Sequence, residues 1–311
     1  MTMNQEQLDK HIDNLIKQTE NEAEKILARR LKYIKQAMAD MLDKYSSEDD
    51  PHVTWTEFNK YDRFKKELKR IEELLQGDYS EIINLILLSQ TTIYLNNYMR
   101  SLYMYEYTSG IQMTFTVPSA RQIANALAQP IDLIKLAPTF ARHRKQVIEK
   151  LRGHIAQGVL AGNSYNQIAN AINKDVGLSM RQARMVARTE THRAWNTSTN
   201  DAMDKAKTFG ARIVGFWDAT LDIKTRSSHR KLDGTKEDEN GMFKVGFSNG
   251  PAPGLLVGVD SAKQNINCRC KKLATVNGME PEVRRARNED GSTNLMPYMD
   301  YQTWYESKKK K

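Results

Sequence analysis

The feature that most constrains the fold is a run of apolar residues at helical spacing near the start of the chain. These residues recur with a mean step of about 3.7 positions, close to one helical turn, and charged residues fill the positions between them. Apolar residues at this spacing lie on one face of a helix, so the pattern predicts a long amphipathic helix. The apolar positions are Leu8, Ile12, Leu15, Ala23, Leu27, Leu31, Ile34, Met38, Met41 and Tyr45.

Helix signals continue through the first two thirds of the chain. A Thr-x-x-Glu capping box, Thr54 with Glu57, predicts a second helix that Gly77 ends. Proline, glycine and two further capping pairs, Ser164 with Gln167 and Ser179 with Gln182, bound the later helices. These are expected at about 80–107, 119–129 and 139–157, then from 164 and from 179 to a stop near Gly210.

The pattern changes after Gly210. Residues 212–217 and 255–259 are short β-prone runs between clusters of Gly, Pro, Asn and Asp. From Met279 onward the chain is polar and ends in four lysines, which predicts an extended tail. The expected fold is therefore α+β and predominantly helical. It comprises a helical region (1–160), a small loop-rich α+β module (161–275) and a basic tail (276–311).

Charge and cysteine content narrow the class of protein. The 311 residues carry a net charge of +9, which suits a polyanionic partner such as DNA. The two cysteines are two residues apart, a poor geometry for a disulfide, which fits a reducing compartment. The longest apolar run, 82–88, is interrupted by Asn84 and is far shorter than a membrane span. No signal peptide is expected.

One set of polar and cysteine residues recurs in a distinctive order between positions 188 and 270. In that order and spacing the chain resembles the Mu protein F-like, SPP1 minor head protein-like family of phage head morphogenesis or minor capsid proteins. The residues that carry the resemblance are Arg188, Glu190, Asn196, Asp222, His229, Asp233, Gly234, Asn267, Cys268 and Cys270.

The resemblance implies a minor capsid protein inside the head of a tailed phage or prophage, assembled in the host bacterial cytoplasm. Its implied partners are the portal protein, a scaffolding or major capsid protein, and the double-stranded phage DNA. Proteins of this family assist head assembly, and some bind DNA without sequence preference and accompany it during ejection.

Three groups of basic residues are candidates for phosphate contacts. Arg181, Arg184 and Arg188 share one helical face with His192 and Trp195, an arrangement that suits phosphates and stacked bases. The other candidates are Arg142, Lys145 and Arg152 on the helix from 139, and Lys308, Lys309 and Lys310 in the tail. The alternative is that these are solvated helix faces or structural ion pairs.

Tyrosines are concentrated between positions 94 and 107. Tyr94, Tyr98 and Tyr105 are candidates for docking to a protein partner, because tyrosine combines a large contact area with a polar tip. Ordinary helix packing is the alternative.

Asp222, His229, Cys268 and Cys270 are candidate zinc ligands. Cysteines at i and i+2 in an extended segment point to the same side, and a histidine or carboxylate could complete a tetrahedral site. The alternative is a hydrogen-bonded loop network in which the cysteines pack as small apolar residues. No other cofactor is expected.

Two enzymatic alternatives remain beside a structural role. A metal-dependent nuclease would use the His229 cluster, although few carboxylates or histidines are available to converge on one metal. An ADP-ribosyltransferase-like effector would use Arg188, the triplet 197–199 and the acidic triplet 237–239. That triplet 197–199 falls in a predicted helix rather than a strand, so we expect no enzymatic activity.

Overall fold

The computed structural model describes residues 5–43, 62–128, 135–161, 163, 165–280, 282–287 and 293–309. The chain forms two compact units, each made from separate stretches of sequence. Unit 1 contains residues 1–17, 88–133 and 188–311, and unit 2 contains residues 18–87 and 134–187. The domains predicted from the sequence, 1–160, 161–275 and 276–311, have different boundaries from these two units. That division into domains stays a prediction.

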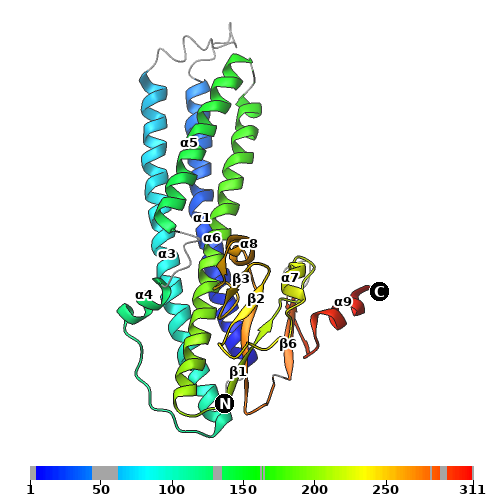
Figure 1. Ribbon diagram of the computed structural model, residues 1–311. Helices are drawn as coiled ribbons and strands as arrows, with labels where there is room; N and C mark the ends of the chain where they lie inside the picture. Colours follow the sequence, from blue (N-terminus) through cyan, green and yellow to red (C-terminus); the bar gives the residue numbers. More distant parts are fainter. Residues whose placement is uncertain are drawn as a thin grey trace. The chain divides into compact units, whose positions relative to one another are not determined.

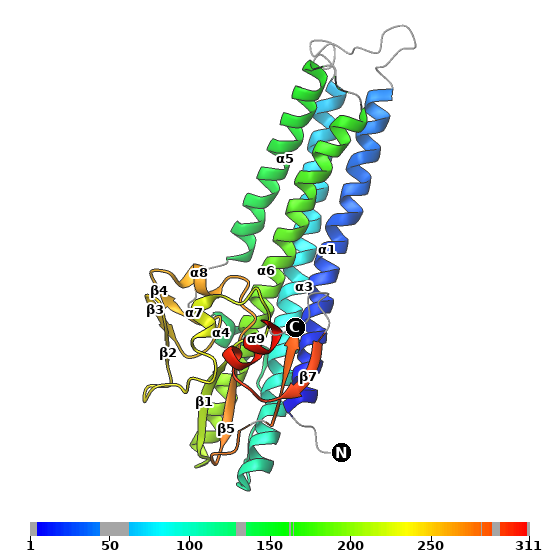
Figure 2. The same cartoon turned by 90° about the vertical axis from the view of Figure 1, so that its right-hand side faces the viewer.

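Unit 2 is built from long helical segments. They belong to α1 (Gln5–Asp43), α3 (Asp62–Ser109), α5 (Leu136–Leu160) and α6 (Tyr165–Thr208). In Figures 1 and 2 these segments run side by side. Their apolar faces form one core, which includes Leu27 and Ile34 of α1, Ile82 of α3, and Phe140 of α5. The periodicity at the start of the chain therefore correctly predicted a long helix with a buried face.

Two predicted helix boundaries are wrong. Gly77 lies inside α3, and α6 runs through Ser179 without a break. A glycine inside a helix costs about 1 kcal/mol relative to alanine. Around Gly77, burial of Leu75, Tyr79 and Ile82 in the core offsets that cost. The predicted capping box at Thr54 lies outside the described residues.

Unit 1 combines helical segments of α1, α3 and α6 with short strands. α6 ends at Thr208 and is followed by Gly210 at a φ of 90°, as the glycine stop predicted. The remaining elements are α4 (Ala120–Ala128), β1 (Ile213–Asp218), α7 (Ser227–Arg230), β2 (Phe243–Val245), β3 (Ser248–Gly250), β4 (Val257–Gly258), α8 (Ser261–Asn265), β5 (Lys271–Val276), β6 (Val283–Arg287), β7 (Thr293–Pro297) and α9 (Tyr301–Lys309).

The described strands form three small antiparallel sheets. β1 pairs with β5 from Ile213 opposite Val276 to Asp218 opposite Lys271, and the two strands lie together in Figure 2. The second sheet has the order β2-β3-β4, and the third is the hairpin β6-β7. The apolar core beside these sheets contains Trp217, Phe243, Leu256 and both cysteines. The structure confirms a predominantly helical α+β fold.

The expectation of an extended tail is wrong for much of residues 276–311. The end of β5, the hairpin β6-β7 and α9 occupy this region. Tyr301 and Trp304 of α9 are buried in the core of unit 1, and Arg284 of β6 is buried among carboxylates. The burial of Tyr301, Trp304 and Arg284 stabilises this folded segment, although its composition is otherwise polar.

None of the helices in the described ranges is both long enough and apolar enough to cross a membrane.

Candidate functional site

Three potential metal ligands meet in the interior of unit 1. His229 lies on the short helix α7, and Cys268 and Cys270 flank Arg269 just before β5. Nδ1 of His229 is 3.5 Å from the Sγ atom of Cys268 and 3.5 Å from that of Cys270. All three side chains are buried, and their ligand atoms lie within 4.8 Å of one another. The structure thus places His229 and the two cysteines together.

The orientation of the His229 ring is fixed on its other side. Nε2 of His229 is 3.1 Å from Oε1 of Gln264, and Nε2 of Gln264 donates a hydrogen bond of 2.8 Å to Oδ2 of Asp260. Because the Gln264 amide is oriented by Asp260, its oxygen faces the ring, so Nε2 carries the proton and Nδ1 presents a lone pair to the sulfurs. Trp217 packs edge-on against the ring, with centroids 5.1 Å apart.

The two thiols differ in acidity because each influences the other. A hydrogen bond from Cys270 lowers the pKa of Cys268, although burial opposes this effect. Burial raises the pKa of Cys270 well above its usual value, and the interaction with Cys268 acts in the same direction. Both cysteines are free of disulfide bonds.

Asp222 does not belong to this cluster, which corrects its place in the predicted ligand set. Its carboxylate forms an ion pair of 2.5 Å with Arg269. Oδ1 also accepts hydrogen bonds from the Lys224 backbone and the Thr225 hydroxyl. Asp222 therefore orders the loop before α7 and is already satisfied by these partners.

Arg188 and Thr189, at the N-terminal end of the sequence motif, fix the turn that precedes the cysteines. Arg188 donates a hydrogen bond of 3.0 Å to the Asn267 side chain, and the Asn267 backbone N–H donates one of 2.9 Å to the Thr189 hydroxyl. Asn267 has a φ of 58°, a left-handed conformation that asparagine tolerates better than most residues. Cys268 follows directly from this turn.

Glu190 ties α6 to two other helices of unit 1. Its Oε2 accepts hydrogen bonds from Gln90 of α3, at 2.9 Å, and from Arg193, at 2.7 and 3.1 Å. Arg193 also donates to the backbone carbonyl of Leu127 in α4. Glu190 is buried, and the charge of Arg193 together with the hydrogen bond from Gln90 makes its burial tolerable.

Asp233 and Gly234 form a second anchor. The Asp233 carboxylate accepts hydrogen bonds from Arg284 and from the backbone N–H groups of Ala219 and Tyr301. Gly234 has a φ of 73°, and its N–H donates to the Trp217 carbonyl. The turn thus needs glycine for its backbone conformation.

Asn196 connects α6 to β5. Its amide donates a hydrogen bond of 3.2 Å to the Cys270 carbonyl, and its Oδ1 accepts one of 2.8 Å from the Lys272 N–H. We expect Asn196→Ala to lower the free energy of unfolding by about 2 kcal/mol, because it leaves buried backbone groups of β5 without partners. Urea unfolding followed by tryptophan fluorescence measures this effect. Thr208→Ala, at an exposed position of the same helix within unit 1, is the control and is expected to change stability by less than about 0.5 kcal/mol. Equal effects would contradict the role of Asn196.

The candidate phosphate-binding residues fall into different environments. Arg142, Lys145 and Arg152 are exposed on α5, and Arg181 is exposed on α6. Arg184 is not available, because it forms ion pairs with Glu20 and Glu24, which raise its pKa. Arg188 belongs to unit 1 and bonds Asn267, while His192 and Trp195 are buried. The predicted phosphate- and base-binding face is therefore wrong for Arg184 and Trp195.

In the tail, Lys308 and Lys309 are the last residues of α9, and nothing is described of their side chains. Lys310 lies outside the described residues.

Tyr94, Tyr98 and Tyr105 are buried, which corrects their predicted role in docking. They pack in the core of unit 1 against residues such as Met203 and Ile213, and Tyr94 donates a hydrogen bond of 2.6 Å to Asp201. Burial raises the pKa of all three tyrosines. Tyr103 and Tyr107 on the same helix are the exposed ones, at 49% and 69%.

The residues of the transferase alternative do not form a strand-based NAD site. Residues 197–199 lie in α6, and Ser198 is fully buried. Glu237 is paired with Lys207 at 3.0 Å and Lys272 at 2.6 Å. Asp238 accepts hydrogen bonds from backbone N–H groups in its own turn.

Several residues that build the site carried no sequence signal that we recognised. Gln264 and Arg284 lie in stretches that look like ordinary polar loop or tail. Lys271 is half-buried and pairs with Asp9, and Lys272 is buried and pairs with Glu237. The alternation of Cys268, Cys270 and Lys272 is the one pattern that marks a buried strand face, since i and i+2 share a side.

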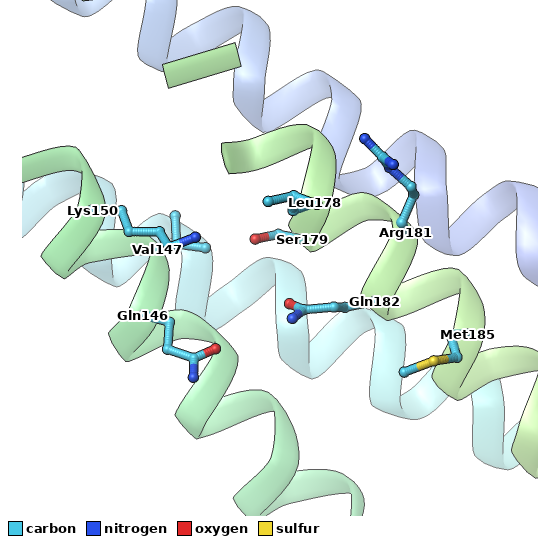
Figure 3. A pocket seen from close by; sticks show the side chains of 8 residues that line it. All are labelled: Gln146, Val147, Lys150, Leu178, Ser179, Arg181, Gln182 and Met185. Atoms are coloured by element: carbon cyan, nitrogen blue, oxygen red, sulfur yellow. The ribbon is translucent and has the colours of Figure 1, made fainter. Parts of the chain in front are cut away.

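Unit 2 has a pocket of about 220 Å³ between α5 and α6. Figure 3 shows its lining, with Lys150, Gln146 and Val147 on one helix and five residues from Leu178 to Met185 on the other. The lining is mixed, and no group of potential metal ligands occurs here among the described residues.

The chain matches a family of phage proteins, and it also matches a phage protein along nearly its whole length. The profile of the family described as "Phage Mu protein F like protein" matches residues 149–273. The chain is 37% identical over 307 residues to "Minor head protein GP7" of Bacillus phage SPP1, covering 98% of each chain. No solved structure matches the chain.

Two more distant relatives share only part of their length with this chain. "NAD(+)--arginine ADP-ribosyltransferase EFV" of Enterococcus faecalis is 29% identical over 203 residues, which is 65% of this chain and 40% of that protein. An "Uncharacterized protein" of Haemophilus influenzae is 27% identical over 172 residues, 54% of this chain and 33% of that protein.

Proposed function

Since the chain belongs to the phage minor head protein family, whose members act in head morphogenesis, we propose that it contacts the packaged DNA inside the head through the exposed basic face of α5. Family membership makes the chain a head component that associates with other head proteins. Its association with the portal, its assembly in the host cytoplasm and its departure with the genome are proposed from the family alone.

The observation that supports DNA contact is a stripe of cations on one face of α5. Arg142, Lys145 and Arg152 are exposed at spacings of three and seven residues, so they share a face about 15 Å long. Together with Arg144 they line a shallow hollow that also contains Glu72 and Glu149. Four cations against two carboxylates leave an excess of two positive charges. Flexible exposed cations of this kind contact phosphates without reading bases.

The test is DNA binding by the purified full chain across a salt series. We expect sequence-independent binding that weakens steeply as salt rises, because phosphate contacts release counterions. The triple variant Arg142→Glu, Lys145→Glu and Arg152→Glu is expected to bind at least tenfold more weakly. Its log–log salt dependence is expected to be shallower by about 3, from about 0.9 per phosphate contact.

A matched control has the same change of net charge elsewhere on unit 2. Lys65→Glu, Lys66→Glu and Lys69→Glu alters three exposed lysines of α3. If this control loses as much affinity as the α5 variant, binding reflects net charge and the stripe has no specific role. If the unmodified chain does not bind DNA at low salt, the DNA proposal is wrong.

The relative named as an ADP-ribosyltransferase is a reason to run the same samples with substrates. Plasmid DNA with magnesium tests the nuclease alternative, and arginine-rich protein with labelled NAD tests the transferase alternative. We expect intact DNA and no transferred label. Magnesium-dependent cleavage or label transfer, at a rate proportional to protein concentration, would replace the structural proposal with an enzymatic one.

A further inference from the structure

We propose that His229, Cys268 and Cys270 form a binding site for one thiophilic metal ion of the zinc type, in the interior of unit 1. The structure brings together one imidazole nitrogen and two sulfurs from segments about 40 residues apart in sequence. This inference is independent of DNA binding.

The distances fit the size of a zinc ion. Zn–S bonds are about 2.3 Å and Zn–N bonds about 2.0–2.1 Å. An ion at these distances from the His229 Nδ1 and from each sulfur, with both N···S separations at 3.5 Å, subtends an S–Zn–N angle of about 105–110°. That is the angle of tetrahedral coordination, so the imidazole nitrogen stands at the separation from each sulfur that a zinc site requires.

The histidine is held in the tautomer that a metal requires. Gln264 accepts the proton of Nε2, at 3.1 Å, and is itself oriented by Asp260. Nδ1 therefore directs its lone pair at the two sulfurs. Metal-bound histidines usually have such a partner on the other nitrogen, which fixes the ring and increases its basicity. Gln264 is a positioning residue, since it acts on the metal only through His229.

The proposed site has three protein ligands and one open corner. Asp222 cannot fill that corner in this fold, because its carboxylate is engaged by Arg269, Thr225 and the Lys224 N–H. A water molecule or hydroxide is the expected fourth ligand. Binding one divalent ion replaces the protons of the two thiols, which pass to solvent, so the metal is held by two thiolates and a neutral imidazole.

A bound ion would join α7 to the strand-entry segment at 268–270. In the structure these two segments meet where Nδ1 of His229 faces the two sulfurs. Because a metal that binds the folded state stabilises it, loading is expected to raise the melting temperature of unit 1.

The first test uses the tag-free full chain, since a histidine tag would itself bind metal. After purification under reducing conditions with zinc present and exhaustive dialysis, elemental analysis is expected to give about one zinc per chain. Replacement by cobalt(II) is expected to produce thiolate-to-cobalt charge-transfer absorption and visible bands of tetrahedral intensity. A folded chain that retains no zinc and gives no cobalt bands would overturn the proposal, leaving a hydrogen-bonded thiol cluster.

Variants separate ligation from folding. Cys268→Ser, Cys270→Ser and His229→Ala are each expected to lose the cobalt bands, whereas Asp222→Asn and the partly exposed His154→Ala are expected to keep them in their folded fraction. Gln264→Ala keeps all three ligands and is expected to weaken metal affinity 10–100-fold. Gln264→Glu keeps an oxygen facing Nε2 but cannot donate to Asp260, so its metal affinity is expected to lie between those of Gln264→Ala and the unmodified chain. Retention of the bands in both cysteine variants, or their loss in Asp222→Asn alone, would overturn the assignment.

Discussion

Arg284→Met is expected to lower the free energy of unfolding of unit 1 by about 3–5 kcal/mol, the usual cost of removing one partner from a buried ion pair. The Arg284 side chain is 2% exposed and contacts Asp233 at 2.8 Å and Asp218 at 2.7 Å. It also donates hydrogen bonds to the carbonyls of Met299 and Ala219. Methionine fills similar space but removes the cation that Asp233 and Asp218 share, and Asp218 then keeps only Lys271, 4.0 Å away.

The measurement is urea unfolding followed by tryptophan fluorescence. Trp195, Trp217 and Trp304 all belong to unit 1, and Trp55, in the sequence range of unit 2, is replaced by phenylalanine in every sample, so the emission reports unit 1. Lys236→Met is the control, because Lys236 pairs with Glu280 at 3.6 Å where both side chains are more than half exposed. Such a pair contributes about 0–1 kcal/mol. If Arg284→Met costs no more than Lys236→Met, the buried network does not stabilise the unit.

Trp217→Ala is expected to cost about 3–5 kcal/mol, because it leaves a large cavity in a packed core. Trp217 is fully buried, and its ring meets Phe243 at 5.5 Å and His229 at 5.1 Å between centroids. We also expect Trp217→Ala to weaken binding of the metal proposed for His229, since the imidazole ring of His229 loses the edge-on packing contact with Trp217.

Val214→Ala is the matched control for Trp217→Ala, because Val214 lies on the same strand and is 40% exposed. Its expected cost is below about 1 kcal/mol. Trp217→Phe is expected to lie between the two, since it keeps an aromatic ring in the core. The indole N–H makes no hydrogen bond among the described residues. Equal stability of Trp217→Ala and Val214→Ala, from the same urea titration, would contradict this description of the core.

The parts of the fold that were predicted from sequence rest on local patterns. The apolar period from Leu8 onward predicted α1, and the glycine at 210 predicted the end of α6. The prediction that Gly77 ends a helix was wrong, because the free-energy cost of a glycine inside a helix is smaller than the stabilisation from burying the apolar residues around it. The tail was mistaken for extended chain because Arg284, Tyr301 and Trp304 owe their burial to partners far away in sequence.

The candidate site was predicted in outline and not in its details. The spacing of Cys268 and Cys270 indicated a shared side, and His229 does lie beside them. Asp222 looked equally suitable, and only the position of Arg269 in space removes it. Gln264 could not be identified, since an amide side chain becomes a positioning group only through what it faces. The tyrosines show the same limit, because Tyr103 and Tyr105 differ in exposure through helix rotation alone.

The ion pair between Lys271 and Asp9 joins residues 262 positions apart within unit 1. During translation this separation in sequence delays the formation of the ion pair. Every stretch of unit 2 has been synthesised once residue 187 has emerged, and that unit can close while translation continues. The Asp9 carboxylate receives its cation only after Lys271 has been synthesised. The apolar partners of Leu8, Ile12 and Ile16 include Ile93 and Trp195, which precede Lys271 in sequence, so the apolar face of these first turns can be covered earlier. The charged contact of the N-terminal segment is therefore made after its apolar ones.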